Sequence, residues 1–344
     1  MINNNLKFSI LLINIMSRYD QTPWIEKYRP FKLEDIILYE NTQKKIKKII
    51  EDKEMTNLIL PGVPGIGKTT TIKCIARALY GKYADEAVLE LNASDDRGIK
   101  AVQEKIVNFC KKKMDLNDRG GNIDGKKYSE HKLIFLDEAD NMTNKAQRLI
   151  NNLMEKYNKT TRFAFTCNSS SDIIEGIQSR CIILRFYRLR KDQVVFRLEK
   201  ICELENIIMD KKGLDVIADI ADGDLRSAIN SLQLVYRSCN TISVENIYKV
   251  CSKPQPKIIK SIIEDCIKKD FIEAKNKIFD LKKVGYSESD IILGIIHLLK
   301  IDTTIKEEIR ISYLEKVCYY AYVISKGLAT DIQLISCISS LIML

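Results

Sequence analysis

The chain has few residues that could build a zinc site or a disulfide framework. Its 344 residues include only two histidines, His131 and His297, and no two of its ten cysteines form a C-x-x-C pair. Structural zinc sites need such ligands at short, recognisable spacings, so no zinc site can be built here, and nothing in the cysteine spacing suggests a disulfide framework. We expect the cysteines to be reduced core residues of an intracellular protein.

The sequence also lacks an apolar run that could cross a membrane, which takes about 20 residues. The first run, residues 8–16, has nine residues and contains Asn14. Lys7 before it would suit a signal peptide, but Ser17 and Arg18 follow instead of a small-residue cleavage site. We expect residues 1–22 to be a disordered extension without function, with Met16 as an alternative start, and we expect no membrane partner.

Charge and size set further bounds. The formal net charge of +9 is a mild basic excess, which is compatible with a nucleic-acid partner but is spread along the whole chain. The length predicts two or three domains, and 45% hydrophobic residues are enough to give each a packed core.

Residues 62–69 read Gly-Val-Pro-Gly-Ile-Gly-Lys-Thr, a complete G-x-x-x-x-G-K-T pattern. An apolar run precedes it and a helix-like stretch follows, so the loop amides and the helix N-terminus would surround a phosphate chain. Lys68 would reach the β- and γ-phosphates, and the Thr69 hydroxyl would hold Mg²⁺. The residues predicted to bind a nucleoside triphosphate here are Gly62, Val63, Pro64, Gly65, Ile66, Gly67, Lys68, Thr69 and Thr70.

A second motif lies about 70 residues further on, where the apolar residues 133–136 end in Asp137-Glu138-Ala139-Asp140. Carboxylates at the carboxyl end of a buried parallel strand lie where an open α/β sheet binds its ligand. Asp137 is suited to hold Mg²⁺ through water, and Glu138 to activate the attacking water as general base. The two motifs together predict that the nucleotide is hydrolysed as well as bound.

Short apolar segments alternate with helix-like stretches, which predicts an α/β fold with a parallel sheet and right-handed crossovers. These segments are residues 58–60, 87–91, 133–136, 162–167 and 181–186. Residues 117–130 are polar and glycine-rich and should form a surface loop. From residue 191 onward, apolar positions recur at helical spacing, with a break at Pro254 and Pro256. Residues 291–301 predict a helix packed on several sides.

Several further motifs accompany this pattern. They are the Pro-Trp-Ile-Glu-Lys-Tyr-Arg-Pro of residues 23–30, the segment 91–98, Asn168 after an apolar strand, Ser-Arg-Cys at 179–181, and Gly-Asp-Leu-Arg at 223–226. From Pro23 to the C-terminus the chain resembles AAA+ ATPases, and within them the small subunits of replication factor C, the eukaryotic sliding-clamp loader. Residues 248–256 and 285–287 look closest to the paralogue called subunit two in animals.

This resemblance implies a domain plan and roles for individual residues. Residues 23–188 would form the AAA+ P-loop core, 189–252 a small helical lid, and 253–344 an all-helical collar domain for oligomerisation. Trp24, Tyr28 and Arg29 would line the adenine. The catalytic residues would be Glu138, Asn168 at the sensor-1 position, Arg226 at the sensor-2 position, and Arg180 as an arginine finger toward the neighbouring subunit's ATP.

DNA contacts are implied near the start of the helix that follows Asn92, where family members bind phosphates. Arg97 and Lys105 are the candidates. Gln103 stands where relatives commonly have a basic residue, and Asn151-Asn152 where the family usually has an Arg-Arg pair. These departures leave a thinner basic track and put part of the subunit-interface network in doubt.

The resemblance thus implies a nuclear ATPase subunit that uses ATP and Mg²⁺ to open a sliding clamp and load it onto primer–template junctions in replication and repair. Its partners would be the other replication factor C subunits, the clamp and the DNA phosphate backbone. Two alternatives are an ATP-binding scaffold subunit of the same complex and a different AAA+ DNA-processing ATPase. Glu138, Asn168 and Arg226 argue against a scaffold, because a scaffold needs none of them.

Overall fold

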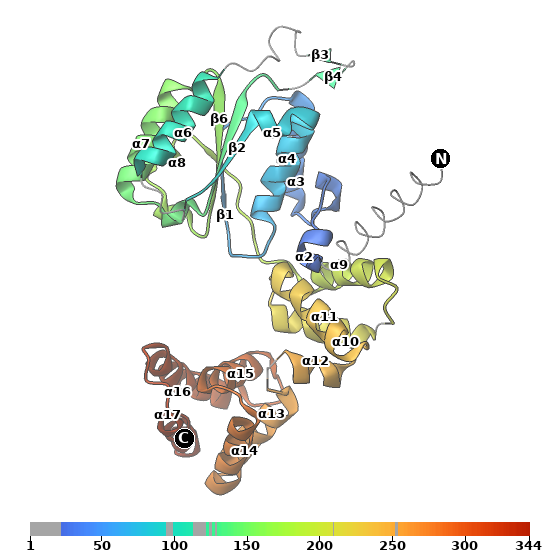
Figure 1. Cartoon of the computed structure of the whole chain (residues 1–344). Coiled ribbons are helices and arrows are strands. Elements are labelled where there is room, and N and C mark those ends of the chain that lie inside the picture. Colours follow the sequence, from blue (N-terminus) through green and yellow to red (C-terminus); the bar gives the residue numbers. More distant parts are fainter. Residues whose placement is uncertain are drawn as a thin grey trace, which may run out of the picture. The chain divides into compact units, whose positions relative to one another are not determined.

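The computed structural model of the chain describes residues 22–93, 99–112, 122–123, 126–127, 129–208, 210–251 and 254–344. It divides into two compact units, the first ending at Gln233 and the second formed by Leu234–Leu344. Figure 1 shows the sheet in the first unit and helices only in the second. The predicted extension before Thr22 and the predicted DNA contact Arg97 lie outside the described residues.

The first unit is built on a parallel five-stranded sheet with the strand order β2-β5-β6-β1-β7. The strands are β1 Leu58–Pro61, β2 Val88–Asn92, β5 Lys132–Asp137, β6 Thr161–Cys167 and β7 Ile182–Ile183. This confirms the predicted α/β sheet. β7 is shorter than the predicted strand, although the amides of Leu184 and Phe186 still donate to the carbonyls of Ile59 and Pro61 along β1.

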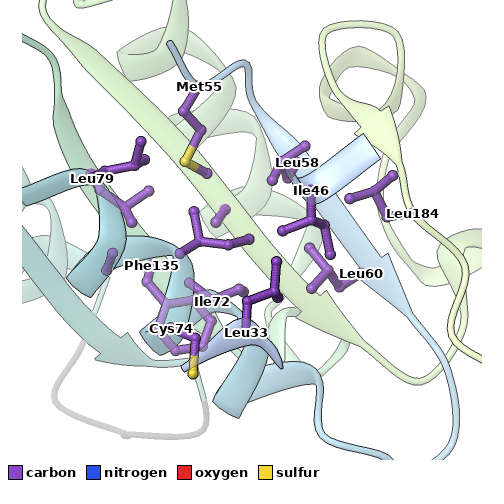
Figure 2. Packing of buried hydrophobic residues seen from close by; sticks show 14 of the residues in the cluster. Leu33, Ile46, Met55, Leu58, Leu60, Ile72, Cys74, Leu79, Phe135 and Leu184 are labelled. Atoms are coloured by element: carbon purple, nitrogen blue, oxygen red, sulfur yellow. The ribbon is translucent and has the colours of Figure 1, made fainter. Parts of the chain in front are cut away.

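Helices cover both faces of this sheet (Figure 1). One face carries α3 Glu40–Asp52, α4 Lys68–Tyr80 and α5 Ala84–Ala87, and the other carries α6 Ile99–Lys111, α7 Asn144–Lys156 and α8 Glu175–Gln178. Alternate residues of a strand point to opposite faces, so Leu58 and Leu60 pack with α3 and α4 (Figure 2), whereas Ile59 packs on the other side. Burial on both faces explains why these strands are apolar throughout.

The region predicted as a loop contains a small antiparallel hairpin, β3 Asn122–Ile123 with β4 Lys126–Lys127. The loop prediction was therefore wrong for these four residues. The two residues between the strands are Asp124 and Gly125 in the sequence. This pair is a strong signal for a two-residue hairpin turn, and the polar composition around it concealed that signal.

The remaining elements are helical, as predicted. Around the sheet lie α2 Trp24–Lys27 and the 3₁₀ turns η1 Leu33–Asp35, η2 Gly81–Tyr83, η4 Ala139–Asn141 and η5 Ser170–Asp172. After β7 come α9 Lys191–Leu204, α10 Lys211–Ala221, α11 Leu225–Cys239, α12 Val244–Val250, α13 Pro256–Ile267, α14 Phe271–Val284, α15 Glu288–Ile301, α16 Glu307–Ser325 and α17 Asp331–Ile342. Proline at the first position of α13 explains the predicted break.

The second unit has its own core, in which α15 contributes Ile291, Ile295 and Leu299. Leu293 of the same helix is 60% exposed, so α15 is covered on fewer sides than its sequence predicted. Within the described part of the chain, no helix combines the length and the apolar character that a membrane span requires.

Leu79 of α4 tests the packing of the first unit, because its side chain is fully buried between helix and sheet. We expect Leu79→Ala to lower the free energy of unfolding of this unit by about 2–5 kcal/mol. The matched control Leu204→Ala, at a position that is 67% exposed, should stay within about 0.5 kcal/mol. Trp24 is the single tryptophan and is buried in this unit, so urea unfolding followed by its fluorescence measures both variants. Equal effects would contradict the packing.

Candidate functional site

A cavity of about 610 Å³ opens at the carboxyl ends of β1, β5 and β6, beside the start of α4. Parallel strands end at one edge of a sheet, so residues from distant parts of the sequence meet there. The predicted site residues that line the cavity are Tyr28, Arg29, Pro64, Gly65, Ile66, Gly67, Lys68, Thr69, Thr70, Asp137, Glu138, Asn168 and Arg226. Gly62, Val63 and Trp24 do not line it.

The phosphate-binding loop has a backbone that favours glycine at two positions. Gly67 caps α4 with φ of 92°, and Gly65 has φ of 74°. A Cβ atom on Gly65 would lie 1.8 Å from Asp224 Oδ1, a distance at which no side chain fits. Gly65 therefore lets residue 224, just before α11, lie directly against the loop.

Lys68 lies at the centre of the cavity wall. Its ammonium donates to the carbonyl oxygen of Gly62, to that of Cys167 at 3.1 Å, and to Asn168 Oδ1 at 3.4 Å. Burial lowers the pKa of Lys68, while the neighbouring acidic groups act in the opposite direction. The side chain is thus a partly desolvated cation held between β1 and β6, which suits it to bind phosphate oxygens.

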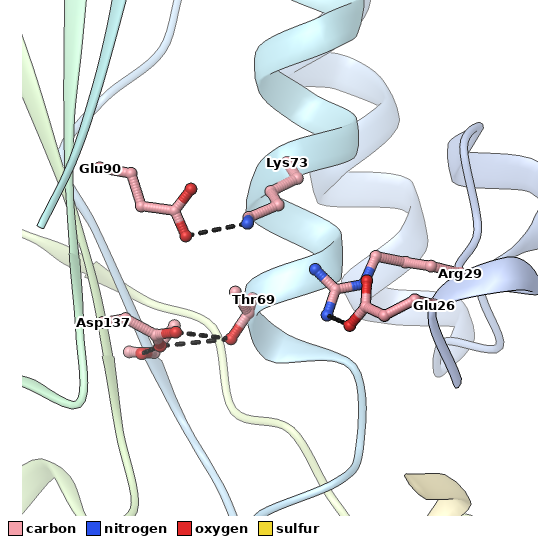
Figure 3. Close-up of polar contacts among 7 residues, drawn as sticks. Glu26, Arg29, Thr69, Lys73, Glu90 and Asp137 are labelled. Atoms are coloured by element: carbon pink, nitrogen blue, oxygen red, sulfur yellow. Dashed lines mark hydrogen bonds and ion pairs between the residues drawn. The ribbon is translucent and has the colours of Figure 1, made fainter. Parts of the chain in front are cut away.

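The Thr69 hydroxyl is 3.2 Å and 3.1 Å from the two carboxylate oxygens of Asp137 (Figure 3). The Thr166 hydroxyl donates to the same carboxylate. Mg²⁺ prefers oxygen ligands and keeps several waters and phosphate oxygens in its shell, so one carboxylate and one hydroxyl fit it. The described residues contain no cluster of three or more His, Cys, Asp or Glu that would hold a metal without a nucleotide.

Glu138 directly follows this carboxylate and has an unusual backbone. Its φ is 54° and its ψ is 44°, the left-handed region that few non-glycine residues occupy. The side chain is exposed to the cavity, and Asn141 Nδ2 lies 3.3 Å from Glu138 Oε2. Such strain in a cavity-lining acid supports a functional role for the residue.

Asp140 holds Asn168 in place, a role that the sequence analysis missed. Its Oδ2 accepts from the backbone amide of Asn168 at 3.0 Å and from the side-chain Nδ2 at 2.8 Å. Both donors fix the amide group at the end of β6, next to Lys68. The sequence did offer a signal for this role, because Asp140 is the fourth residue of the Asp-Glu-Ala-Asp motif.

The N-terminal box is bound to the helices that follow the sheet. Glu205 accepts from the Tyr28 hydroxyl and forms an ion pair with Lys27 at 2.7 Å. Burial raises the pKa of Glu205, but the hydrogen bonds from Lys27 and Tyr28 outweigh it and lower the pKa. Arg197 Nη2 donates to the Tyr28 carbonyl at 2.7 Å. Both Arg197 and the Tyr28 side chain border the cavity.

Trp24 does not contribute to the cavity wall as predicted. Its side chain is 5% exposed, and its backbone amide donates to Gln233 Oε1 at 3.0 Å. The indole packs inside the unit, because a large apolar ring is stabilised by burial. Trp24 therefore anchors the box from which Tyr28 and Arg29 reach the cavity.

Two ion pairs that the sequence analysis did not predict line the cavity (Figure 3). Lys73 Nζ of α4 lies 2.9 Å from Glu90 Oε1 of β2, and Arg29 Nη2 lies 2.6 Å from Glu26 Oε1. Each pair balances its charges locally. In the described part of the chain, the cavity-lining cations outside these two pairs are Lys68, Arg197 and Arg226.

Arg226 and Arg180 lie in different parts of the unit. Arg226 lines the cavity at the start of α11, which is capped by Asp224 Oδ1 accepting from the Ser227 amide at 2.9 Å. Arg180 precedes β7, whereas the phosphate-binding loop follows β1. Because these strands are parallel neighbours, the two features lie at opposite ends of the sheet, about 13 Å apart along a four-residue strand.

Lys105 is exposed on α6, and Gln103 is half-buried on the same helix. The other candidate for a DNA contact, Arg97, cannot be compared with it because it lies outside the described residues. Lys105 therefore remains a prediction.

Comparisons with known proteins match both halves of the chain. Residues 58–189 match the family described as "ATPase family associated with various cellular activities (AAA)", and residues 254–340 match the "Replication factor C C-terminal domain". The chain is 42% identical to the probable replication factor C subunit 2 of Dictyostelium discoideum, over 93% of this chain and 91% of the relative. It is 38% identical to replication factor C subunit 4 of Saccharomyces cerevisiae, over 93% and 96%.

Solved structures support the same architecture. The RuvB Holliday junction branch migration motor of Thermotoga maritima matches with a TM-score of 0.52, covering 69% of this chain and 79% of the motor at 18% identity. At that identity the likeness shows the fold alone. The two family matches and the relatives near 40% identity show more: this chain belongs to the AAA+ ATPases, and within them to the replication factor C small subunits of the subunit 2 and 4 class.

Proposed function

We propose that this chain is an ATP-hydrolysing subunit of a clamp loader, which couples ATP binding and hydrolysis to opening a sliding clamp and placing it on primer–template DNA. One observation carries the proposal. Lys68, the Thr69–Asp137 pair, Glu138 and Asn168 surround a single cavity at the carboxyl edge of the sheet. A subunit that only bound ATP as a scaffold would need the first two features and not the last two.

In the proposed binding mode, the loop amides and Lys68 hold the β- and γ-phosphates. Thr69 and Asp137 hold Mg²⁺, which neutralises phosphate charge when it is bound. The ammonium of Lys68 exchanges its carbonyl partners for phosphate oxygens, since charged acceptors make stronger hydrogen bonds than carbonyls do. The base lies against the N-terminal box near Tyr28 and Arg29.

For hydrolysis, the Glu138 carboxylate accepts the proton of the attacking water. Asn168, fixed by Asp140, orients that water and the γ-phosphate. Arg226 binds the γ-phosphate of the same subunit from the helical region. Because phosphoryl transfer needs little covalent chemistry from the protein, positioned charges supply most of the catalysis.

Arg180 is proposed to complete the neighbouring subunit's site as an arginine finger. It lies away from its own cavity, so it has no route to its own γ-phosphate. Such an arrangement requires assembly with other replication factor C subunits. Lys105, together with Arg97, is proposed to bind the DNA phosphate backbone, and the complex to act in the nucleus.

Lys68 and Glu138 have separable roles in this proposal. Lys68→Ala should abolish ATP binding, because it removes contacts made in the ground state. Glu138→Gln should keep ATP bound and stop turnover, because the base is needed mainly in the transition state. Equilibrium binding and steady-state ATPase of the assembled complex check both, with the exposed Glu86→Gln as control. Turnover at this chain's own site that survives Glu138→Gln would contradict the role of Glu138, and no turnover there in the wild-type complex would favour the scaffold alternative.

Arg180→Ala should leave this subunit's own ATP affinity nearly unchanged and lower the ATPase of the assembled complex. Arginine fingers contribute about 10³-fold or more in rate, but only one of several sites is affected, so the total activity falls partially. Mixing the variant with wild-type partners and identifying the inactive site by nucleotide trapping checks this, with Arg237→Ala as the exposed control. If the inactive site were this chain's own, the role in trans would be wrong.

A further inference from the structure

We propose that Glu155 is a positioning residue for Arg180: it holds the guanidinium in the orientation in which the finger meets the neighbouring subunit's γ-phosphate. This inference rests on the proposed function of Arg180. Nothing in the sequence pointed to Glu155, which lies on α7, 25 residues before Arg180.

The guanidinium of Arg180 is held at two of its nitrogens. Nη2 lies 2.5 Å from Glu155 Oε1, and Nη1 donates to the carbonyl oxygen of Gly176 at 2.7 Å. The backbone of the same residue is also fixed, because its carbonyl oxygen accepts from Asn57 Nδ2 at 3.3 Å. An exposed arginine with no partners would sample many rotamers, and these contacts select one of them.

The Glu155 carboxylate is itself placed by α7. Asn151 lies one helical turn earlier, and its Nδ2 is 3.4 Å from the same Oε1 atom. Gly176 lies against this amide, and a Cβ atom there would come within 3.4 Å of it. Among the described residues, Arg180 is the one cation that forms an ion pair with Glu155.

The Arg180 guanidinium has N–H donors left over after its hydrogen bonds to Glu155 and Gly176 are made. A guanidinium has five N–H donors in a rigid, planar fork. The two contacts within the chain use two of them, which leaves three for phosphate oxygens. Arg180 can therefore stay attached to Glu155 and Gly176 while it contacts a phosphate on the next subunit. Glu155 thus fixes the plane of the Arg180 guanidinium both before and during the contact with phosphate.

The pair contributes little to folding, since the two side chains are 41% and 51% exposed and exposed ion pairs stabilise proteins weakly. Its effect is geometric. Misplacing a catalytic group by about 1 Å costs roughly 10²-fold in rate. We expect Glu155→Ala to lower the hydrolysis rate at the neighbour's site by about tenfold to a hundredfold, less than Arg180→Ala does.

The test uses the full complex, reassembled with Glu155→Ala, Glu155→Gln and the control Glu175→Gln, an exposed glutamate on α8. Single-turnover hydrolysis at the neighbour's site is measured over a range of ATP concentrations. Glu155→Ala should lower the maximal single-turnover rate there and leave the half-saturating ATP concentration nearly unchanged. Glu155→Gln keeps an acceptor without the charge and should restore part of the rate. Full rates in both variants, with thermal stability intact, would overturn the inference.

A second measurement separates this inference from the proposed role of Arg180. In the Arg180→Ala background, adding Glu155→Ala should have no further effect, because the residue acts through the finger. A further loss would mean that Glu155 acts by another route, which overturns the inference. If Arg180→Ala itself left the hydrolysis rate at the neighbour's site unchanged, the proposed role of Arg180 as an arginine finger would be wrong.

Discussion

The register of three parallel strands is the constraint on which the site depends. Phe135 of β5 lies beside Ala164 of β6, and Ala164 lies beside Leu58 of β1. In this register the phosphate-binding loop, Asp137 and Asn168 emerge at one edge of the sheet. A slip by one residue would turn the carboxylate of Asp137 to the opposite face. The apolar side chains on both faces prevent such a slip, so the core of the unit also determines the geometry of the cavity.

Local patterns explain why much of this could be predicted from the sequence. The glycine-rich loop and the Asp-Glu pair each consist of a few consecutive residues, and the short strands are recognisable as apolar runs. Contacts between distant residues could not be predicted in the same way. Tyr28 and Glu205 are 177 residues apart, and neither belongs to a pattern that indicates the other. The backbone amide of Trp24 likewise donates to Gln233, which lies 209 residues away.

Partly buried charged groups lie at one end of the sheet, and an exposed arginine lies at the other. At the carboxyl edge, Lys68 and Asp137 are partly desolvated and held by several hydrogen bonds, and Glu138 adopts a strained backbone. At the amino edge, Arg180 is exposed and held by side-chain and carbonyl acceptors of α7 and α8. A parallel sheet cannot bring these two edges together within one chain. The topology therefore supports the proposed division of one catalytic site between two subunits.

We propose that the cavity of this chain binds Mg²⁺–ATP by itself, and that a neighbour's arginine speeds the hydrolysis of this ATP as Arg180 does for the next subunit. The most direct measurement is single-turnover hydrolysis of ATP bound to this chain, first alone and then with increasing amounts of the other subunits. We expect tight, Mg²⁺-dependent binding by the isolated chain and slow hydrolysis, which accelerates by about 10³-fold or more on assembly. Hydrolysis by the isolated chain at the full rate of the complex would contradict it, as would a failure of the isolated chain to bind ATP.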